Sequence, residues 1–201
     1  MSFAAVVLAA GSARRFGSDK LSATLRGEPL VFHAIRAARA APVTRVIVVA
    51  HPGLATGEWP GGPEVIVTRL GSSALSDSLR AGLAEAGDVA GLFVFLGDMP
   101  LVPHDVAARL ASLIGDHYAA MPCFRGEPGH PVLLSRRAFA DVEGLQGDAG
   151  AGKLLRSRRD VVFDECPDPL VNFDIDRPEH LASLTSPLRR TRHVFERDGH
   201  V

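Results

Sequence analysis

The sequence predicts an open, doubly wound α/β fold in which a mostly parallel sheet lies between two layers of helices. Short runs of valine, leucine and phenylalanine alternate with stretches whose hydrophobic residues recur about every three or four positions. Such runs are typical of buried parallel strands, and such stretches are typical of the helices that cover both faces of a sheet. Because 201 residues with 46% hydrophobic content suffice for one sizeable core, we expect one domain over 1–185 and a C-terminal tail over 186–201.

The predicted elements follow in chain order. The strands are short and apolar, and they cover Phe3–Leu8, Val46–Val49, Val65–Val67, Leu92–Leu96, Tyr118–Met121, Val132–Leu134 and Val161–Phe163. The helices between and after them cover Leu30–Ala40, Ala74–Ala86, His104–Leu113, Arg137–Val142, Ala151–Ser157 and Pro178–Leu184. The glycine- and proline-rich segment Gly53–Pro63 predicts an exposed loop. In sheets of this class ligands bind beyond the carboxyl ends of the strands, so the loops there hold the candidate functional residues.

Composition argues against several classes of protein. The net charge is −1, with 22 basic and 23 acidic residues, so no overall field attracts nucleic acid or an anionic membrane. The apolar start lacks the basic residues of a signal peptide, and no other run reaches the length of a membrane span. The two cysteines, Cys123 and Cys166, lack metal-ligand spacing. We therefore expect a cytoplasmic protein that binds neither nucleic acid nor membrane and holds any phosphate locally.

A glycine-rich loop directly follows the first predicted strand and ends at Lys20. Its small residues allow backbone N–H groups to approach an anion, while Arg14, Arg15 and Lys20 supply positive charge for a triphosphate. A flexible connection with solvated charges is the alternative interpretation.

The stretch Leu8–Lys20 resembles the signature of the MobA-like nucleotidyltransferases, Leu-Ala-Ala-Gly-x-Ser-x-Arg-x-Gly-x-x-Lys, with Ala13 where the family usually has serine. The resemblance implies a Rossmann-like, three-layer α/β/α nucleotidyltransferase fold. It also implies catalytic roles for Arg15 and Lys20, which would grip the triphosphate and offset charge on the pyrophosphate leaving group. The nucleotide-binding residues that it implies are Leu8, Ala9, Ala10 and Gly11. In this family Ala-Ala-Gly is typical of the cytidylyl branch, which favours CTP.

An aspartate follows the most apolar predicted strand, in Gly97-Asp98-Met99-Pro100. A carboxylate at the carboxyl end of a strand suits Mg²⁺, with Mn²⁺ as an alternative, whereas an aspartate before proline can also simply shape a turn. The string is similar to the metal motif of the family. We therefore expect Asp98 to bind the metal and Gly97 to contact the nucleotide.

A second acidic segment, Asn172–Glu179, resembles the family's Asp-Ile-Asp-Thr-Pro-Glu-Asp. Its carboxylates alternate, so that in extended chain Asp174 and Asp176 lie on one face. The resemblance implies that Asp174 is the second metal ligand. Asp176 is a weaker candidate, because it can instead cap the helix that starts near Pro178.

Three further strings resemble binding loops of cytidylyltransferases. Ser78 lies in a hydroxyl-rich helix start similar to their base-contacting loop, although helix capping explains some of those hydroxyls. Gly-His-Pro around His130 and Gly-Asp-Ala-Gly-Ala around Asp148 resemble the molybdopterin cytidylyltransferase branch, which implies that both residues bind the acceptor. Gly152 stands where that branch has arginine, so either Lys153 supplies the charge or the acceptor differs.

The resemblance as a whole implies a metal-dependent transfer of a nucleoside monophosphate, with CTP as the favoured donor, to a phosphorylated small-molecule acceptor. The expected acceptor is molybdopterin or molybdenum cofactor, with pyrophosphate as the second product and a molybdoenzyme or maturation factor as partner. Two alternatives stay open. One is a guanylyl- or sugar-1-phosphate nucleotidyltransferase of the same fold, and the other is a nucleotide-binding cofactor chaperone without turnover.

Overall fold

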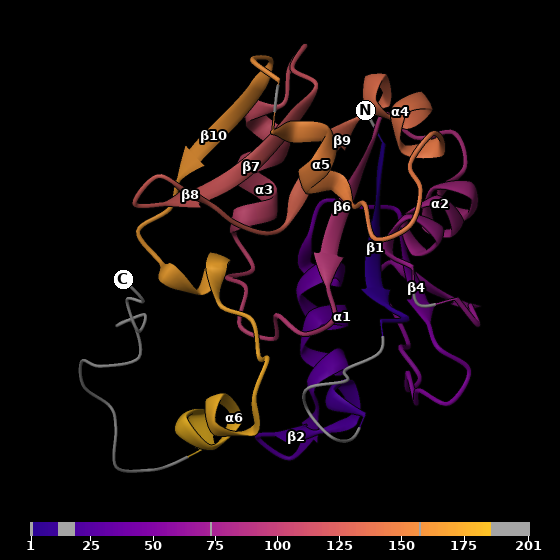
Figure 1. Ribbon diagram of the computed structural model, residues 1–201, viewed down its shortest axis with the longest axis vertical. Coiled ribbons are helices and arrows are strands. Elements are labelled where there is room, and N and C mark those ends of the chain that lie inside the picture. Colours follow the sequence, from indigo (N-terminus) through magenta and orange to yellow (C-terminus); the bar gives the residue numbers. More distant parts are fainter. Residues whose placement is uncertain (1, 12–18, 73, 157, 186–201) are drawn as a thin grey trace.

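The computed structural model describes residues 2–11, 19–72, 74–156 and 158–185, and its centre is one large twisted sheet (Figure 1). Its strands are β1 (Phe3–Ala9), β4 (Arg45–Ala50), β5 (Glu64–Arg69), β6 (Gly91–Leu96), β7 (Ala119–Phe124), β8 (Glu127–Pro128), β9 (Val132–Ser135) and β10 (Val161–Glu165). They lie in the order β10-β7-β9-β6-β1-β4-β5, with β8 paired to β7, while β2 (Thr24–Leu25) and β3 (Glu28–Pro29) form a separate pair. This arrangement confirms the predicted doubly wound α/β class.

One strand runs against the others in the middle of the sheet. β9 pairs antiparallel with β6 on one side and with β7 on the other, whereas β1, β4, β5 and β6 are mutually parallel. The reason is the length of the connection. Between Phe124 and Val132 the chain makes only the short β7–β8 hairpin, and a parallel connection needs a much longer crossover.

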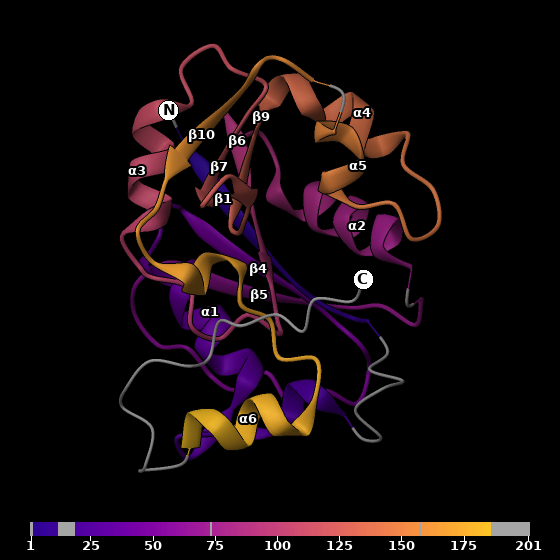
Figure 2. The ribbon, with the colours of Figure 1, turned by 60° about the vertical axis from the view of Figure 1, so that its left-hand side comes forward.

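Helices cover both faces of the sheet, and Figure 2 shows α3 on one side with α2, α4 and α5 on the other. The helices are α1 (Leu30–Ala40), α2 (Leu75–Ala86), α3 (Val106–Leu113), α4 (Phe139–Glu143), α5 (Ala151–Leu155) and α6 (Pro178–Thr185), with short 3-10 turns η1 (Lys20–Ser22), η2 (Arg136–Ala138) and η3 (Pro169–Asn172). One apolar core joins α1 and α3 to the sheet, and a second joins α2, α4 and α5 to the opposite face. The result is the expected three-layer arrangement.

Element boundaries differ little from the sequence-based ones. α1 has the predicted limits, whereas α3 starts at Val106, because a turn in which Val106 N–H donates to Pro103 O precedes it. The helix predicted over Arg137–Val142 is divided into η2 and α4. The predicted tail, 186–201, lies outside the described residues. Within the described ranges no helix combines the length and the apolar character needed to cross a bilayer.

At the carboxyl-end edge of the sheet, the segment after β6 lies in close contact with β1. Gly97 N–H donates to Leu8 O at 3.0 Å, and a Cβ on Gly97 would lie 3.1 Å from that same oxygen. A side chain at position 97 would crowd this oxygen, so glycine favours the close approach of the loop after β6 to β1. Strand order reverses between these two strands, because β4 follows on one side of β1 and β6 on the other. Crevices at such reversals bind ligands in open α/β sheets.

Candidate active site

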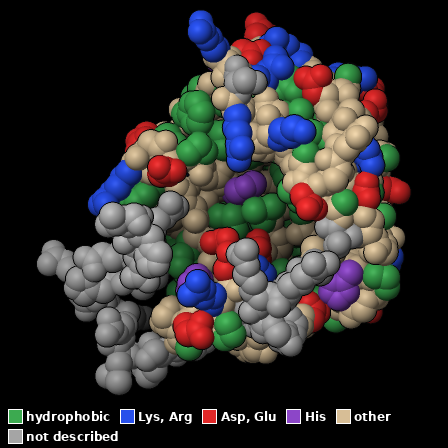
Figure 3. Space-filling model, viewed as in Figure 1, with side chains coloured by type: hydrophobic (Ala, Val, Ile, Leu, Met, Phe, Trp, Pro, Cys, Tyr) green, Lys and Arg blue, Asp and Glu red, His purple; other side chains and the backbone are tan. Residues whose placement is uncertain are grey.

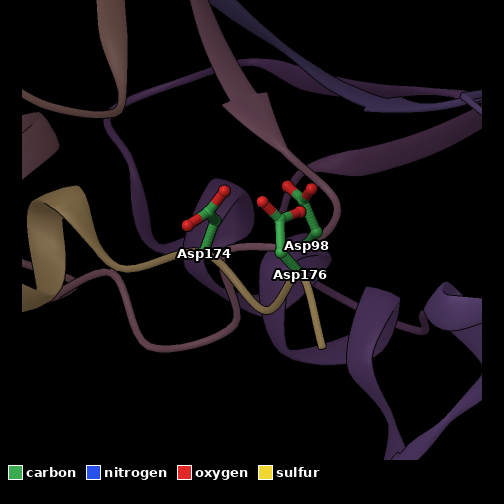
Figure 4. A group of neighbouring side chains, drawn as sticks. All are labelled: Asp98, Asp174 and Asp176. Carbon is green, nitrogen blue, oxygen red and sulfur yellow. The ribbon is translucent and has the colours of Figure 1, made fainter. Parts of the chain in front are cut away.

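Three aspartates meet beyond the carboxyl end of β6, as the close-up in Figure 4 shows. Asp98 lies two residues after β6, and Asp174 and Asp176 lie between η3 and α6. Each offers one carboxylate oxygen, and these three oxygens all lie within 4.8 Å of one another. The cluster joins segments that are far apart in sequence, and it includes both predicted metal ligands.

Ile175 explains why the second and third carboxylates reach the first. Its side chain is fully buried with Leu25 and Leu30 in a small third core, and its N–H donates to the backbone oxygen of Asp98 at 3.0 Å. The flanking Asp174 and Asp176 are thereby held beside Asp98. In the alternating sequence Asp174-Ile175-Asp176, the apolar residue therefore fixes the position of the two acidic side chains on either side of it.

Lys20 is the basic member of the site. Its Nζ lies 2.8 Å from Asp98 Oδ2 and 3.1 Å from Asp176 Oδ1, and its side chain is only 10% exposed. Burial alone would lower the pKa of Lys20, but the hydrogen bonds and negative charges of Asp98 and Asp176 outweigh it and raise that pKa above its ordinary value. The lysine is therefore an ammonium ion at neutral pH.

The cluster retains surplus negative charge. Desolvation, together with the charges of Asp176 and Asp98, raises the pKa of Asp174 above its ordinary value. When all three aspartates are ionised, their charge exceeds that of the Lys20 ammonium by two. A divalent cation with a preference for oxygen ligands would balance this surplus, so the donor set fits Mg²⁺ or Mn²⁺.

His130 lies next to the cluster, on the loop that leads into β9. Its Nδ1 is 3.4 Å from Val94 O, and its backbone N–H donates to Val171 O at 2.8 Å. Desolvation lowers the pKa of His130, against smaller opposing effects of the Val94 carbonyl and the Asp98 charge. A neutral imidazole results at pH 7. The face drawn in Figure 3 is hollowed at its centre, with acidic side chains and a histidine in the hollow.

The N-terminal loop is described only in part. Ala9 and Ala10 are buried at the end of β1, and Gly11 is exposed with open space around its α-carbon. The predicted catalytic Arg15 lies outside the described residues. Where the description resumes, Asp19 accepts a hydrogen bond from Leu21 N–H and lies 3.4 Å from His51 Nε2. Lys20 is thus presented to the cluster from the loop's far end.

The remaining predicted residues lie around the start of α2. Ser78 is buried, and its hydroxyl donates to Ala74 O within the helix. Asp148 is exposed, and its neighbour Gly147 accepts a hydrogen bond from Ser76 N–H in α2. No described contact joins Asp148 to the acidic cluster. The base-contacting role of Ser78 and the acceptor role of Asp148 stay predictions.

Two residues stand out more clearly in the structure than in the sequence. Asp176 is the weaker ligand candidate of the alternating pair by sequence, yet its carboxylate accepts a hydrogen bond from Lys20 and belongs to the same cluster as Asp174. Ser76 went unnoticed, although its hydroxyl is fully buried without a hydrogen-bond partner at the first turn of α2. The alternation of acidic residues carried the signal for Asp176. For Ser76, nothing distinguished one hydroxyl of the serine-rich string from its neighbours.

Comparisons with known proteins point to one family. A sequence model described as MobA-like NTP transferase domain matches residues 5–162. The chain is 31% identical to the purine catabolism protein PucB of Bacillus subtilis (strain 168), with 87% of this chain and 91% of that protein covered. It is 29% identical to the molybdenum cofactor guanylyltransferase of Rhodobacter capsulatus, with 94% and 98% covered.

Solved structures extend the likeness to three dimensions. Rv0371c from Mycobacterium tuberculosis H37Rv superposes with a TM-score of 0.78 and 26% identity, and the match covers 92% of this chain and all of that one. A second crystal structure of that protein, a complex with manganese, superposes with a TM-score of 0.75. The likeness confirms the predicted Rossmann-like fold. Because the sequence model spans most of the chain, this protein belongs to the family of MobA-like NTP transferases.

Proposed function

We propose that this nucleotidyltransferase transfers a nucleoside monophosphate, with CTP as preferred donor, to a phosphorylated small molecule and releases pyrophosphate. One observation carries the proposal. The acidic cluster and the Lys20 ammonium lie together at the reversal of strand order, beside the end of β1 from which the glycine-rich loop starts. Positive and negative groups thus stand where a triphosphate and a divalent cation would meet.

The chemistry needs no nucleophile from the protein. A terminal phosphate oxygen of the acceptor forms a bond to the α-phosphorus, the bond from that phosphorus to the bridging oxygen breaks, and pyrophosphate leaves with the electron pair. Lys20 would donate hydrogen bonds to phosphate oxygens and offset the negative charge that develops on the leaving group. Asp98, Asp174 and Asp176 would hold Mg²⁺, which supplies charge neutralisation at the phosphates when bound.

The end of β1 supports a preference for CTP. Ala9 and Ala10 are both buried, and by the resemblance Ala10 stands where family members that transfer guanylyl groups more often carry glycine. Ala9 packs in the core that contains α1 and α3 and Ala10 in the core on the opposite face, so the preference for CTP rests on the resemblance of this string and not on a contact with the base. Guanylyl transfer is the second candidate, because a relative similar over nearly the whole chain is a molybdenum cofactor guanylyltransferase.

The acceptor side is proposed to lie at His130. Because its single N–H, on Nδ1, donates to Val94 O, the neutral imidazole has an unprotonated Nε2 that can accept a hydrogen bond from an N–H or O–H group of the acceptor without adding a positive charge. Molybdopterin or molybdenum cofactor is the acceptor we favour, from the resemblance of the strings around His130 and Asp148. A molybdoenzyme or maturation factor would then receive the product.

A pyrophosphate-release panel tests the proposal. The four nucleoside triphosphates are each combined with molybdopterin, molybdenum cofactor or a sugar 1-phosphate, with Mg²⁺ or Mn²⁺ present. We expect release with CTP and a molybdenum-cofactor species. Release with GTP alone would establish the guanylyl alternative. Nucleotide binding without release from any pair would contradict the proposal and indicate a cofactor chaperone.

A further inference from the structure

Lys20 contacts two of the carboxylates that would bind the metal. Its Nζ lies 2.8 Å from Asp98 Oδ2 and 3.1 Å from Asp176 Oδ1, and both aspartates belong to the three-carboxylate cluster. The ammonium is therefore placed among the carboxylates that would bind the metal. Its side chain is 10% exposed, against 26% for Asp98 and 49% for Asp176, so it lies on the inner side of the cluster.

A divalent cation and this ammonium compete for the same partners. Both carry positive charge, and both bind carboxylate oxygens. When a metal ion binds one of these carboxylates, the charge-assisted hydrogen bond between that carboxylate and Lys20 becomes weaker. Because the Lys20 side chain is largely buried, the repulsion between its ammonium and the metal ion would be screened less than between two surface charges. Metal binding to the nucleotide-free protein thus requires Lys20 to give up interactions that it already makes.

A bound triphosphate would relieve this competition by giving Lys20 other anionic partners. In the proposed function Lys20 donates hydrogen bonds to the phosphates, so phosphate oxygens offer its ammonium an alternative set of anionic partners. We propose that Lys20 holds the metal ligands in the nucleotide-free protein and that the nucleotide, by attracting Lys20, makes the carboxylates available to the metal. Nucleotide and metal then bind cooperatively. The inference rests on the proposed function for the identity of the nucleotide.

Reciprocity makes the inference measurable without turnover. If Lys20 opposes the metal, its removal must tighten metal binding in the absence of any nucleotide. We expect an increase of about tenfold in affinity, within the roughly 5- to 150-fold range that is common for coupled sites. A lysine that only stabilised the fold around the aspartates would have the opposite effect, since its loss would disorder the ligands.

The test is a Mn²⁺ titration of nucleotide-free protein, with free Mn²⁺ followed by electron paramagnetic resonance. Lys20→Met should bind Mn²⁺ about tenfold more tightly than the wild type. Arg136→Met is the matched control, because Arg136 is exposed and lies far from the cluster. Its backbone N–H donates to the backbone oxygen of Ala90, the residue before β6, at the edge of the sheet opposite the three aspartates. It removes the same charge and should leave Mn²⁺ affinity unchanged. Equal or weaker binding by Lys20→Met would overturn the inference.

Two further measurements cover folding and nucleotide. Added Mn²⁺ should raise the Tm of Lys20→Met more than that of the wild type, and an equal or smaller rise would contradict competition. The chain has only two lysines, so lysine labelled with ¹³C at Cε gives two assignable signals. CTP or GTP added in EDTA should shift the Lys20 signal, and an unmoved signal in nucleotide-bound protein would refute its release. Because none of these readouts requires turnover, they can fail independently of the proposed function.

Discussion

Truncation of Ile175 should separate two of the carboxylates that we propose as metal ligands, Asp174 and Asp176, from the third, Asp98. The Ile175 side chain is fully buried in the small core that it shares with Leu25 and Leu30. Loss of such a side chain to alanine costs about 2–5 kcal/mol, and Ile→Val about 0.5–1.5 kcal/mol. Because this core is separate from the two large ones, we expect much of the cost to appear as local release of the segment with Asp174 and Asp176.

The assay is Mn²⁺ affinity measured alongside thermal unfolding. Ile175→Ala should weaken Mn²⁺ binding about tenfold or more, because the binding-competent arrangement becomes a minor population, and Ile175→Val should have a smaller effect. Ile114→Ala is the matched control, since Ile114 is buried after the last residue of α3 in a different core. It should lower the Tm and leave Mn²⁺ affinity intact. Unchanged affinity in Ile175→Ala, or equal losses in both variants, would refute the anchoring role.

Two other residues give independent tests. A Cβ on Gly129 would lie 2.6 Å from Val171 O, so Gly129→Ala should push η3 away and lower the free energy of unfolding by about 1–3 kcal/mol in denaturant titration. Gly144→Ala, whose Cβ would be no nearer than 3.5 Å to its neighbours, should be close to neutral, and equal effects would contradict the packing argument. Burial and the Glu165 carboxylate raise the pKa of Cys123 to about 11. Since only ~0.1% of such a thiol is ionised at pH 8, iodoacetamide should label Cys123 at least about a hundredfold more slowly in native than in unfolded protein by mass spectrometry. Rapid native labelling would refute this.

Most strands and helices could be predicted because local pattern determines them. α1 keeps its predicted limits, since its hydrophobic residues recur with helical spacing and face one core. The direction of β9 could not be predicted in the same way. Its apolar run is compatible with either direction, and only the short hairpin through Glu127 and Pro128 makes it antiparallel.

The candidate site also has some features that local sequence pattern predicts and others that depend on the tertiary structure. Asp98 could be placed in the candidate site because it closely follows an apolar strand, and Asp174 because its segment resembles a known string; the structure brings the two together, and their role as metal ligands stays a prediction. The pairing of Lys20 with Asp176 joins residues 156 positions apart, and it depends on how Ile175 packs in three dimensions. No local pattern carries such a contact, so the position of the ammonium among the three carboxylates is visible only in the structure.

The most direct test of the account is metal-dependent pyrophosphate release by Asp98→Asn, a change that keeps the side chain's shape and removes its charge. With CTP, acceptor and Mg²⁺ present, we expect the rate to fall at least about a hundredfold, while circular dichroism shows the wild-type fold. Asp88→Asn, at an exposed aspartate before β6, should keep the wild-type rate. Undiminished release by Asp98→Asn would contradict the claim that nucleotidyl transfer takes place at the three-carboxylate cluster.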